Sequence, residues 1–314
     1  SRTVLMGERG GNSSDLPDKT FVTWIVLHLS YSYSVWLLLY VEGGYMIKID
    51  KHDYIRFYDM FKELGSYTFF LSALDGLVKG QLYTNDEKNP TYAIMLTADL
   101  YYLAGDMSGE EFEKNILGLS QSDAFDDCTG LVFSSKHIRR IREVFGEHTY
   151  KFIERHNYQL TQLDFNPVDT TTTCADIIRI TPMTISNFKN HANYKEVYDE
   201  CMFYWDEYSI DSKINFANIL VKDKMILSYC YVCGESSSEN SCELGIETFE
   251  GFRRKGYAEK ICSETAKELL ILGYETFNWH CHADNIGSSK TALKLGFKKV
   301  EETHLAWFKK SLDK

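Results

Sequence analysis

This chain has few prolines, no excess of basic residues and no low-complexity tract. It has only four prolines in 314 residues, and its 34 Lys and Arg residues are outnumbered by 45 Asp and Glu residues. The net charge of -11 disfavours a general nucleic-acid-binding protein, which needs a basic face to neutralise phosphates. It is compatible with cationic partners such as amines. The apolar share of 44% is typical of a globular protein, and the length allows two domains.

Cysteine does not follow the spacing of a disulfide framework. The chain has eight cysteines, which we interpret as reduced thiols of a cytoplasmic protein. Cys230 and Cys233 form a Cys-x-x-Cys pair, and His280 and His282 flank Cys281. No second Cys-x-x-Cys pair with zinc-site spacing accompanies them. We therefore predict no metal and favour buried or half-buried thiols.

Residues 1–45 differ from the rest of the chain. The stretch 21–41 has 21 residues and no charge except a possible one on His28, so it is long enough to cross a bilayer as a helix. Scattered serines, threonine and tyrosines make it a poor spanning segment, and its flanks give no clear orientation signal. Met46 is a plausible native start. Three interpretations stay open: an extension outside the functional fold, which is favoured, extra strands, or a membrane anchor.

The remainder mixes helices and strands and divides near residue 170. The turn 166–169 is followed by four threonines, 170–173, and is the best linker candidate in the chain. We therefore predict an N-terminal domain over 46–170 and a C-terminal domain over 171–314. In the C-terminal part, hydrophobic periodicity predicts strands at 176–180, 216–221, 225–233, 242–248, 275–281, 298–302 and 305–308, and helices at 257–272 and 285–295.

A basic, glycine-containing turn, Arg253-Arg254-Lys255-Gly256-Tyr257-Ala258, separates the predicted strand 242–248 from the predicted helix. The first N–H groups of a helix have no intrahelical partner, and the helix dipole is positive at that end. Such a turn is suited to binding a pyrophosphate. The alternative is a solvated basic turn that caps a helix.

The order of elements and two motifs resemble the GNAT superfamily of acyl-CoA-dependent N-acyltransferases. The first motif is Arg253-x-x-Gly256-x-Ala258 after the fourth strand, and the second runs from Asn285 to Leu295-Gly296-Phe297. Together with the segment 243–248 and Trp279-x-Cys281, they are most similar to the zwittermicin A resistance-type branch. The resemblance implies an α/β (α+β) fold in which a mixed, mostly antiparallel twisted sheet is flanked by helices. It also implies a GNAT-like N-terminal half.

The same resemblance implies how acetyl-CoA would bind. Main-chain groups of Ile246 and Thr248 would pair with the pantetheine amides, as an added strand would. The pyrophosphate would lie on the turn, whose implied cofactor residues are Arg253, Arg254, Lys255, Gly256, Tyr257 and Ala258. Asn285 would reach the pantetheine or cap the following helix. Ser289, or its neighbour Ser288, would contact the cofactor in the same way.

Acyl transfer to an amine also needs a group that removes a proton. Glu243 and Glu247 lie on the strand where the family often places its base, and alternation puts both on one face. Which of them is the base stays open, and both could be ordinary strand glutamates. The family's usual acid, a tyrosine, is replaced by Ala292. His280, His282 or a water could substitute for it.

These features favour an acetyl-CoA-dependent N-acetyltransferase that acts on a small primary amine by direct transfer in a ternary complex. The alternative is a GNAT-fold module that binds acyl-CoA without turnover, which the missing tyrosine at Ala292 keeps open. The N-terminal half lacks the basic turn, so we predict that it binds no cofactor. We predict no nucleic-acid partner, and homo-oligomers stay open.

Overall fold

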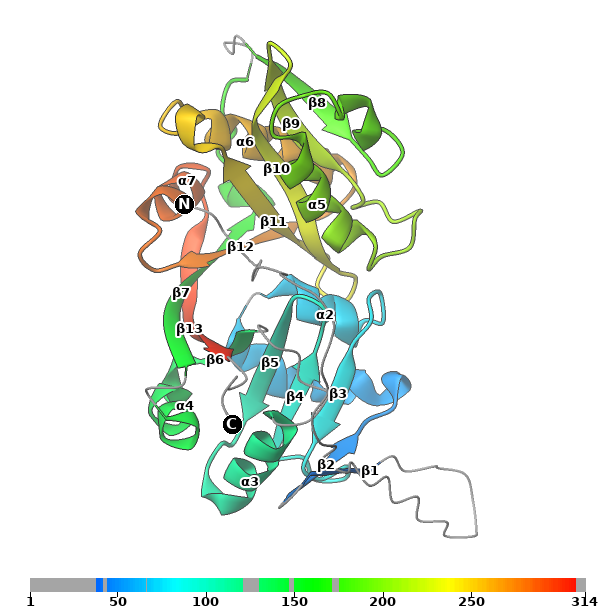
Figure 1. Cartoon of the computed structure of the whole chain (residues 1–314), viewed down its shortest axis with the longest axis vertical. Coiled ribbons are helices and arrows are strands. Elements are labelled where there is room, and N and C mark those ends of the chain that lie inside the picture. The colour runs from blue at the N-terminus through cyan, green and yellow to red at the C-terminus, as the bar shows by residue number, and fades with distance from the viewer. Residues whose placement is uncertain are drawn as a thin grey trace, which may run out of the picture. The chain divides into compact units, whose positions relative to one another are not determined.

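The computed structural model describes residues 38–41, 44–65, 67–120, 130–146, 150–170 and 175–308. The chain forms two compact units (Figure 1). Unit 1 contains Gly65–Lys79 and Glu154–Glu302, and unit 2 contains the described parts of Val4–Leu64, Gly80–Ile153 and Thr303–Lys314. The predicted boundary at residue 170 therefore falls inside unit 1. Sequence patterns could not reveal this, because the segments that join unit 1 carry no motif of their own.

Unit 1 is built on a sheet in the order β7-β12-β11-β10-β9-β8. The strands are β7 (Tyr150–Thr161), β8 (Asp176–Ile180), β9 (Ala217–Lys222), β10 (Met225–Ser236), β11 (Ser241–Thr248) and β12 (Thr276–His282). Neighbours pair antiparallel except β11 and β12, which are parallel. The helices are α2 (Thr68–Leu74), α5 (Tyr194–Trp205), α6 (Tyr257–Ile271) and α7 (Ile286–Lys294). The predicted mixed, mostly antiparallel sheet flanked by helices is confirmed.

Helices cover both faces of this sheet. Tyr231 of β10 packs on Tyr204 of α5, with ring centroids 5.4 Å apart. The preceding residue, Cys230, contacts Cys262 of α6, with the two sulfurs 3.5 Å apart. Because successive side chains of a strand point to opposite faces, α5 and α6 lie on opposite faces (Figure 1). The buried residues of α6 recur at helical spacing, as expected for an amphipathic helix: Ile261, Cys262, Ser263, Thr265, Ala266 and Leu269.

The candidate site lies where β11 diverges from β12. The two strands pair only where Ser241–Glu243 lie beside Thr276–Asn278. Beyond this point β11 continues to pair with β10 as far as Thr248, while β12 pairs with β7. The edge of β11 from Leu244 to Thr248 therefore faces a gap, where its main-chain groups have no partner strand.

Unit 2 repeats the strand pattern of unit 1. Its order is β1-β2-β3-β4-β5-β6-β13, with β5 and β6 parallel and the other pairs antiparallel. The strands are β1 (Leu38–Val41), β2 (Gly44–Lys48), β3 (Gln81–Thr84), β4 (Tyr92–Leu96), β5 (Leu100–Gly105), β6 (Gly130–Ser134) and β13 (Lys298–Phe308). In both units an antiparallel series is followed by one parallel neighbour and then one antiparallel neighbour. This repetition agrees with the GNAT-like N-terminal half.

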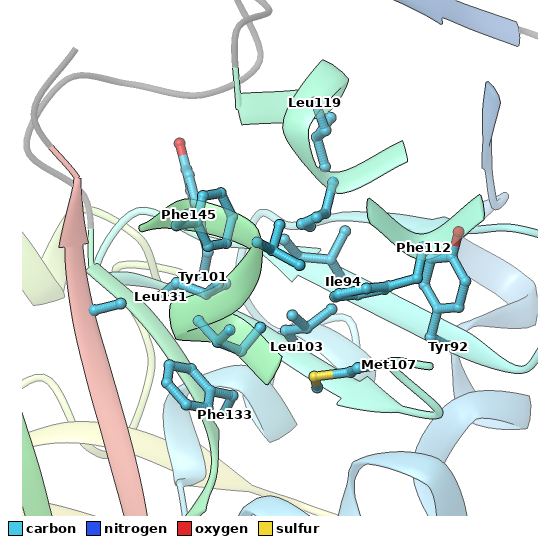
Figure 2. Packing of buried hydrophobic residues seen from close by; sticks show 14 of the residues in the cluster. Tyr92, Ile94, Tyr101, Leu103, Met107, Phe112, Leu119, Leu131, Phe133 and Phe145 are labelled. Carbon is cyan, nitrogen blue, oxygen red and sulfur yellow. The ribbon is translucent and has the colours of Figure 1, made fainter. Parts of the chain in front are cut away.

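The core of unit 2 lies between its sheet and two helices, α3 (Gly109–Ser120) and α4 (Ile138–Phe145). Figure 2 shows side chains from both helices and the sheet meeting in it: Tyr92, Ile94, Tyr101, Leu103, Met107, Phe112, Leu119, Leu131, Phe133 and Phe145. The remaining helix, α1 (Tyr58–Phe61), is short and flanked by 3-10 turns. The sequence before α1 contains no basic, glycine-containing turn like the one before α6.

The described residues of 1–45 belong to strands. Leu38–Val41 forms β1 and pairs with β2, so the extra-strand interpretation is confirmed for this part of the segment. The rest of the uncharged stretch lies outside the described residues. Within the described ranges, every helix is too short or too polar to cross a membrane. At the other end, the two predicted final strands are one strand, β13, because Thr303 and His304 are themselves strand residues that pair with Ser134 and Phe133 of β6.

Candidate functional site

A cavity of about 650 Å³ lies in unit 1 where β11, α6 and α7 meet. Its walls are formed by the end of β11, the basic turn, the first residues of α6, one residue of β12 and one side of α7. The lining residues are Ile246, Glu247, Thr248, Phe252, Arg253, Arg254, Gly256, Tyr257, Ala258, Glu259, Trp279, Asn285, Gly287, Ser288, Lys290, Thr291 and Lys294. Most of the predicted cofactor residues therefore lie around one cavity. Lys255 and Ser289 are absent from its lining.

The basic turn directs the start of α6 toward this cavity. Arg254 and Gly256 both have left-handed backbone conformations, with φ of 64° and 74°. Gly256 is the N-cap of α6, and no side chain caps the first amides of the helix. A Cβ added at Gly256 would meet no atom within 4 Å, so it would extend into open space. Unoccupied amides at a helix N-terminus bind anions, because the helix dipole adds to their hydrogen bonds.

Two cations of the lining are available for an anion. Among the described residues, Arg254 and Lys290 have no hydrogen-bond or ion-pair partner for their charged groups. In contrast, Lys294 pairs with Glu259, with nitrogen and oxygen 2.6 Å apart. The Lys255 ammonium is 3.3 Å from the Gly251 carbonyl and makes a cation–π contact with the Phe252 ring. The prediction for Lys255 therefore concerns its main-chain N–H alone.

The edge of β11 presents alternate main-chain groups to the gap. The N–H of Phe249 donates to Leu227 at 3.1 Å, and the carbonyl of Glu247 accepts from the Ser228 hydroxyl at 2.8 Å. The main-chain groups of residues 247 and 249 thus point toward β10. By the alternation of an antiparallel ladder, Ile246 and Thr248 face away from it. This geometry suits the predicted pairing of Ile246 and of the Thr248 N–H with an extended amide-containing ligand, while the Thr248 carbonyl accepts from Arg253 Nε at 2.9 Å.

The position of Asn285 is compatible with both of its predicted roles. Its Oδ1 accepts from the Ser288 N–H at 3.1 Å, which makes it the N-cap of α7, and the same residue lines the cavity. Ser288 also lines the cavity and accepts a hydrogen bond from Trp279 Nε1 at 2.9 Å. Ser289 instead has its hydroxyl 3.4 Å from the Cys281 sulfur. Of the two serines, Ser288 is the one placed for ligand contact.

The two predicted bases differ in their surroundings. Glu247 lines the cavity, and its side chain is 18% exposed with Arg253 3.9 Å from its carboxylate. Glu243 lies outside the cavity lining, with a side chain 15% exposed. One of its oxygens is 2.7 Å from His280 Nδ1, and the other accepts from the Thr68 N–H at 2.9 Å. The extra residue of the β10–β11 ladder lies in β10, at Cys233, so β11 is regular and both glutamates share a face.

The neighbours of Glu243 keep it ionised. Burial alone would raise the pKa of its carboxyl group. The charge and hydrogen bond of His280, the Thr68 N–H and the charge of Arg155 outweigh burial and hold the pKa below its ordinary value. A carboxylate with a lowered pKa and two occupied oxygens is a weak proton acceptor. Its surroundings suit a positioning or charge-stabilising role.

Position 292, where the family's usual acid is a tyrosine, is an alanine in this chain and offers no hydroxyl. This residue is fully buried, and its carbonyl accepts from the Phe297 N–H at 3.1 Å. The six cysteines within the described ranges are buried thiols. Within those ranges, three potential metal ligands cluster only at Glu154, His156 and Glu302, without a cysteine. The zinc interpretation of the Cys-x-x-Cys pair therefore gains no support, and the absence of a metal requirement stays a prediction.

Three site residues come from segments that sequence reasoning assigned to the N-terminal half. Tyr67 stacks on His280, with centroids 3.9 Å apart and ring planes 7° from parallel. Thr68 donates to Glu243, and its hydroxyl accepts from Asn278 at 2.8 Å. Arg155 lies over Tyr67, 5.8 Å from its centroid. No local signal could have found them, because Tyr67 and Thr68 contact strands more than one hundred residues later and Arg155 contacts Tyr67, 88 positions earlier.

Comparison with known proteins agrees with this geometry. The GNAT acetyltransferase family matches residues 59–305. The uncharacterized N-acetyltransferase YdfB of Bacillus subtilis (strain 168) is 25% identical over 271 residues, which cover 81% of this chain and 95% of that protein. A GCN5-related N-acetyltransferase-like protein from Streptococcus suis has a TM-score of 0.54 at 16% identity, over 83% of this chain and all (100%) of that one.

A second solved structure shows the same fold. The GCN5-related N-acetyltransferase from Sphaerobacter thermophilus has a TM-score of 0.53 at 11% identity, and the match covers 86% of this chain and 98% of that chain. At these identities the structures show a common fold and nothing finer. The family match, in contrast, spans most of the chain, including the basic turn and the Asn285 motif. The chain is a member of the GNAT acetyltransferase family.

Proposed function

We propose that this acetyltransferase transfers the acetyl group of acetyl-CoA to a primary amine of a small molecule, directly and in a ternary complex. The observation that carries the proposal is the cavity at the start of α6. It combines a helix N-terminus without a side-chain cap, two unpaired cations among the described residues, and a strand edge that faces a gap. GNAT acetyltransferases use acetyl-CoA, which supplies an activated acetyl group as a thioester.

The residues of the cavity suit the two ends of that ligand. The amides of Arg254 to Ala258 and the guanidinium of Arg254 would hold the pyrophosphate. Lys290 would add a second positive charge from α7. Ile246 and Thr248 would pair with the pantetheine amides as a neighbouring strand would. Trp279 and Asn285 would form the opposite wall, and the gap would receive the arm between them.

The acceptor is proposed to be a small amine. The net charge of -11 and the glutamates on the α5 face of β11 would attract a cationic molecule. The amine must lose its proton before it attacks, and Glu243 and Glu247 were the predicted bases. We also place the chain beside the zwittermicin A resistance-type acetyltransferases, on the motifs at 243–248 and 252–256.

The experiment measures binding and turnover separately. Thermal or urea unfolding with acetyl-CoA at ~100 times its dissociation constant should show a stabilisation of roughly 2.7 kcal/mol. Release of free thiol should then depend on an amine, screened from a panel of small primary amines. Gly256→Glu should abolish the stabilisation, because its side chain would place a carboxylate in the anion site.

Each outcome has a defined meaning. If acetyl-CoA produces no stabilisation, the cofactor site is assigned wrongly. If it stabilises the protein and no amine releases thiol, the alternative of a non-catalytic acyl-CoA-binding module is favoured. That alternative rests on Ala292, where the family's usual hydroxyl is missing. If Gly256→Glu binds as well as the parent protein, the pyrophosphate does not lie on the basic turn.

A further inference from the structure

One hydrogen bond joins β11 and β12 just where their main-chain ladder ends. Glu243 is the last residue of β11 that pairs with β12, and His280 lies two residues beyond its partner, Asn278. The Glu243 Oε1 and the His280 Nδ1 are 2.7 Å apart. The pair therefore bridges the two strands at the apex of the gap that separates them.

The surroundings fix this pair in one orientation. The second carboxylate oxygen of Glu243 accepts from the Thr68 N–H at 2.9 Å. The imidazole of His280 stacks in parallel on Tyr67, with centroids 3.9 Å apart. The side chain of His280 is only 1% exposed. Each ring nitrogen consequently has a defined environment.

The environment of His280 defines its tautomer. An ionised carboxylate only accepts hydrogen bonds, so the proton of the neutral imidazole is assigned to Nδ1, beside Glu243. The other nitrogen, Nε2, then carries a lone pair. It is buried and has no hydrogen-bond partner in the structure. Buried polar atoms almost always have a partner, so an unpartnered one requires an explanation.

The place of His280 beside Glu243 suggests an explanation, which rests on the proposed function. From Thr248 to Glu243 the edge of β11 spans roughly 17 Å, at about 3.3 Å per residue. This is comparable to an extended pantetheine arm. A cofactor with its pyrophosphate at Gly256 and its amides along Ile246 would bring its thioester toward the apex, where Glu243 and His280 meet.

We infer that His280 is the group that takes the proton from the acceptor amine, and that Glu243 is a positioning residue that holds its tautomer. The neutral amine nitrogen forms a bond to the acetyl carbon while the carbon–sulfur bond breaks. The proton lost by nitrogen passes to Nε2, and from there it goes to the departing sulfur. One histidine would thereby serve both proton transfers, which would account for a hydroxyl being dispensable at Ala292.

The contacts of the other candidates favour His280. Both oxygens of Glu243 already accept hydrogen bonds, from His280 and Thr68. Glu247 lies four residues further along β11, toward the pyrophosphate end, with Arg253 beside it. Of these three candidates, His280 is the one with a buried acceptor atom that has no hydrogen-bond partner among the described residues. Among the described residues, Glu243 and Tyr67 contact the ring, and the charged Arg155 lies over Tyr67 and acts on Glu243.

The test begins with the free protein and needs no activity. Nitrogen-15 NMR of histidine side chains, assigned with His280→Asn, should show that neutral His280 carries its proton on Nδ1 and none on Nε2. Glu243→Gln should change this signal, because the ring loses the carboxylate that selects the tautomer. A finding that Nε2 carries the proton in the unmodified protein would overturn the inference, even if every variant failed to fold.

Kinetics provide the second part of the test. His280→Asn keeps a donor near Glu243 and removes Nε2, so kcat should fall roughly 10²–10⁴-fold. Calorimetric affinity for coenzyme A should change less than about twofold, because the ring lies outside the cavity. The limb of the kcat/KM profile that reports the base should disappear.

His156→Asn is the matched control. This histidine lies on the neighbouring strand β7, and its Nε2 is 3.5 Å from Glu154, in a partly exposed pair. Its replacement should leave kcat and the pH profile unchanged. If the unmodified protein acetylates an amine and His280→Asn retains both kcat and the pH limb, His280 is not the proton acceptor. If the unmodified protein acetylates no amine, it is the proposed function that fails.

Discussion

Arg253 is tied to the strand that precedes it. Its Nε donates to the Thr248 carbonyl at 2.9 Å, and its guanidinium lies 3.9 Å from the Glu247 carboxylate. The basic turn is thus attached to the end of β11, on the same edge that faces the gap. This relationship fixes the proposed anion site at α6 relative to the strand edge along which the pantetheine arm is proposed to lie.

Arg253→Ala should therefore weaken coenzyme A binding through position more than through charge. We expect a loss of about 1 kcal/mol in stability, the usual contribution of one hydrogen bond. Coenzyme A affinity should fall several-fold, and Arg253→Gln, which keeps a donor without the charge, should recover part of it. Calorimetry at two salt concentrations tests this. An Arg253→Gln variant as weak as Arg253→Ala would instead indicate a direct charge contact.

Arg254 and Lys290 should contribute charge directly. Each has no ion-pair partner among the described residues, so its truncation leaves no protein group unpaired. We expect Arg254→Ala and Lys290→Ala each to cost about 1–2 kcal/mol of coenzyme A binding, with little change in stability. Lys255→Ala is the control, because its ammonium contacts the Gly251 carbonyl outside the cavity. Equal losses for all three variants would point to a general field and not to specific contacts.

Gly256 and Gly273 allow backbone strain to be separated from ligand binding. Both have positive φ, 74° and 97°, and a Cβ at either would meet nothing within 4 Å. Alanine at either position should cost about 1 kcal/mol of stability, because the left-handed region disfavours a side chain. Only Gly256→Ala should also weaken coenzyme A binding, since Gly273 follows the far end of α6. Paired urea unfolding and calorimetry distinguish the two effects.

Trp279 should report on occupancy of the cavity. It is 1% exposed, lines the cavity, and donates to Ser288. Coenzyme A should change tryptophan fluorescence, and Trp279→Phe should remove most of that change although four of the five tryptophans remain. The lost hydrogen bond should cost about 1 kcal/mol of stability. A fluorescence change that persists in Trp279→Phe would place the ligand elsewhere.

Glu243 should make stability depend on pH in a definite direction. Its pKa in the folded protein lies below the ordinary value of 4.5, so the unfolded chain binds the proton more tightly. The stabilisation is therefore complete above about pH 4.5 and is lost as the pH falls through the folded-state pKa. Glu243→Gln should cost about 1–3 kcal/mol near pH 7, because the amide keeps one acceptor oxygen and either His280 or Thr68 loses its acceptor.

The same comparison at lower pH checks the sign. The difference in unfolding free energy between the parent and Glu243→Gln should shrink as the pH decreases below 4.5. Urea unfolding of both proteins at several pH values measures it, and effects of other carboxylates cancel in the difference. A difference in unfolding free energy that increases on acidification would mean that burial, and not the partners, dominates the pKa of Glu243.

Local signals predicted the elements of unit 1 closely. Strand 176–180 and the start of the helix at Tyr257 agree with the structure, and the predicted strand 242–248 is β11 within one residue. These elements have strong periodicity and end at glycines or turns. The last strand was divided in error, because the polar residues Thr303 and His304 resemble a turn in sequence and continue the ladder in the structure.

The site was predictable only where it is local. The turn from Arg253 to Ala258 was recognised because its spacing and its place before a helix are properties of a short segment. Of the two serines that the sequence offered, Ser288 lines the cavity and Ser289 contacts Cys281. At a helix start, one position changes the direction of a side chain by about 100°. Sequence spacing could not resolve that difference.

By itself, the sequence determined the order of strands and helices in the C-terminal half and the basic turn before α6, because hydrophobic period and glycine conformation act over a few residues. The tertiary structure alone decided that Tyr67, Thr68 and Arg155 belong to the same unit as this turn. It also decided that Glu243 holds His280 at the apex of the gap. Thr68 and Glu243 are 175 positions apart, and a contact at that separation follows from packing, which no local pattern records.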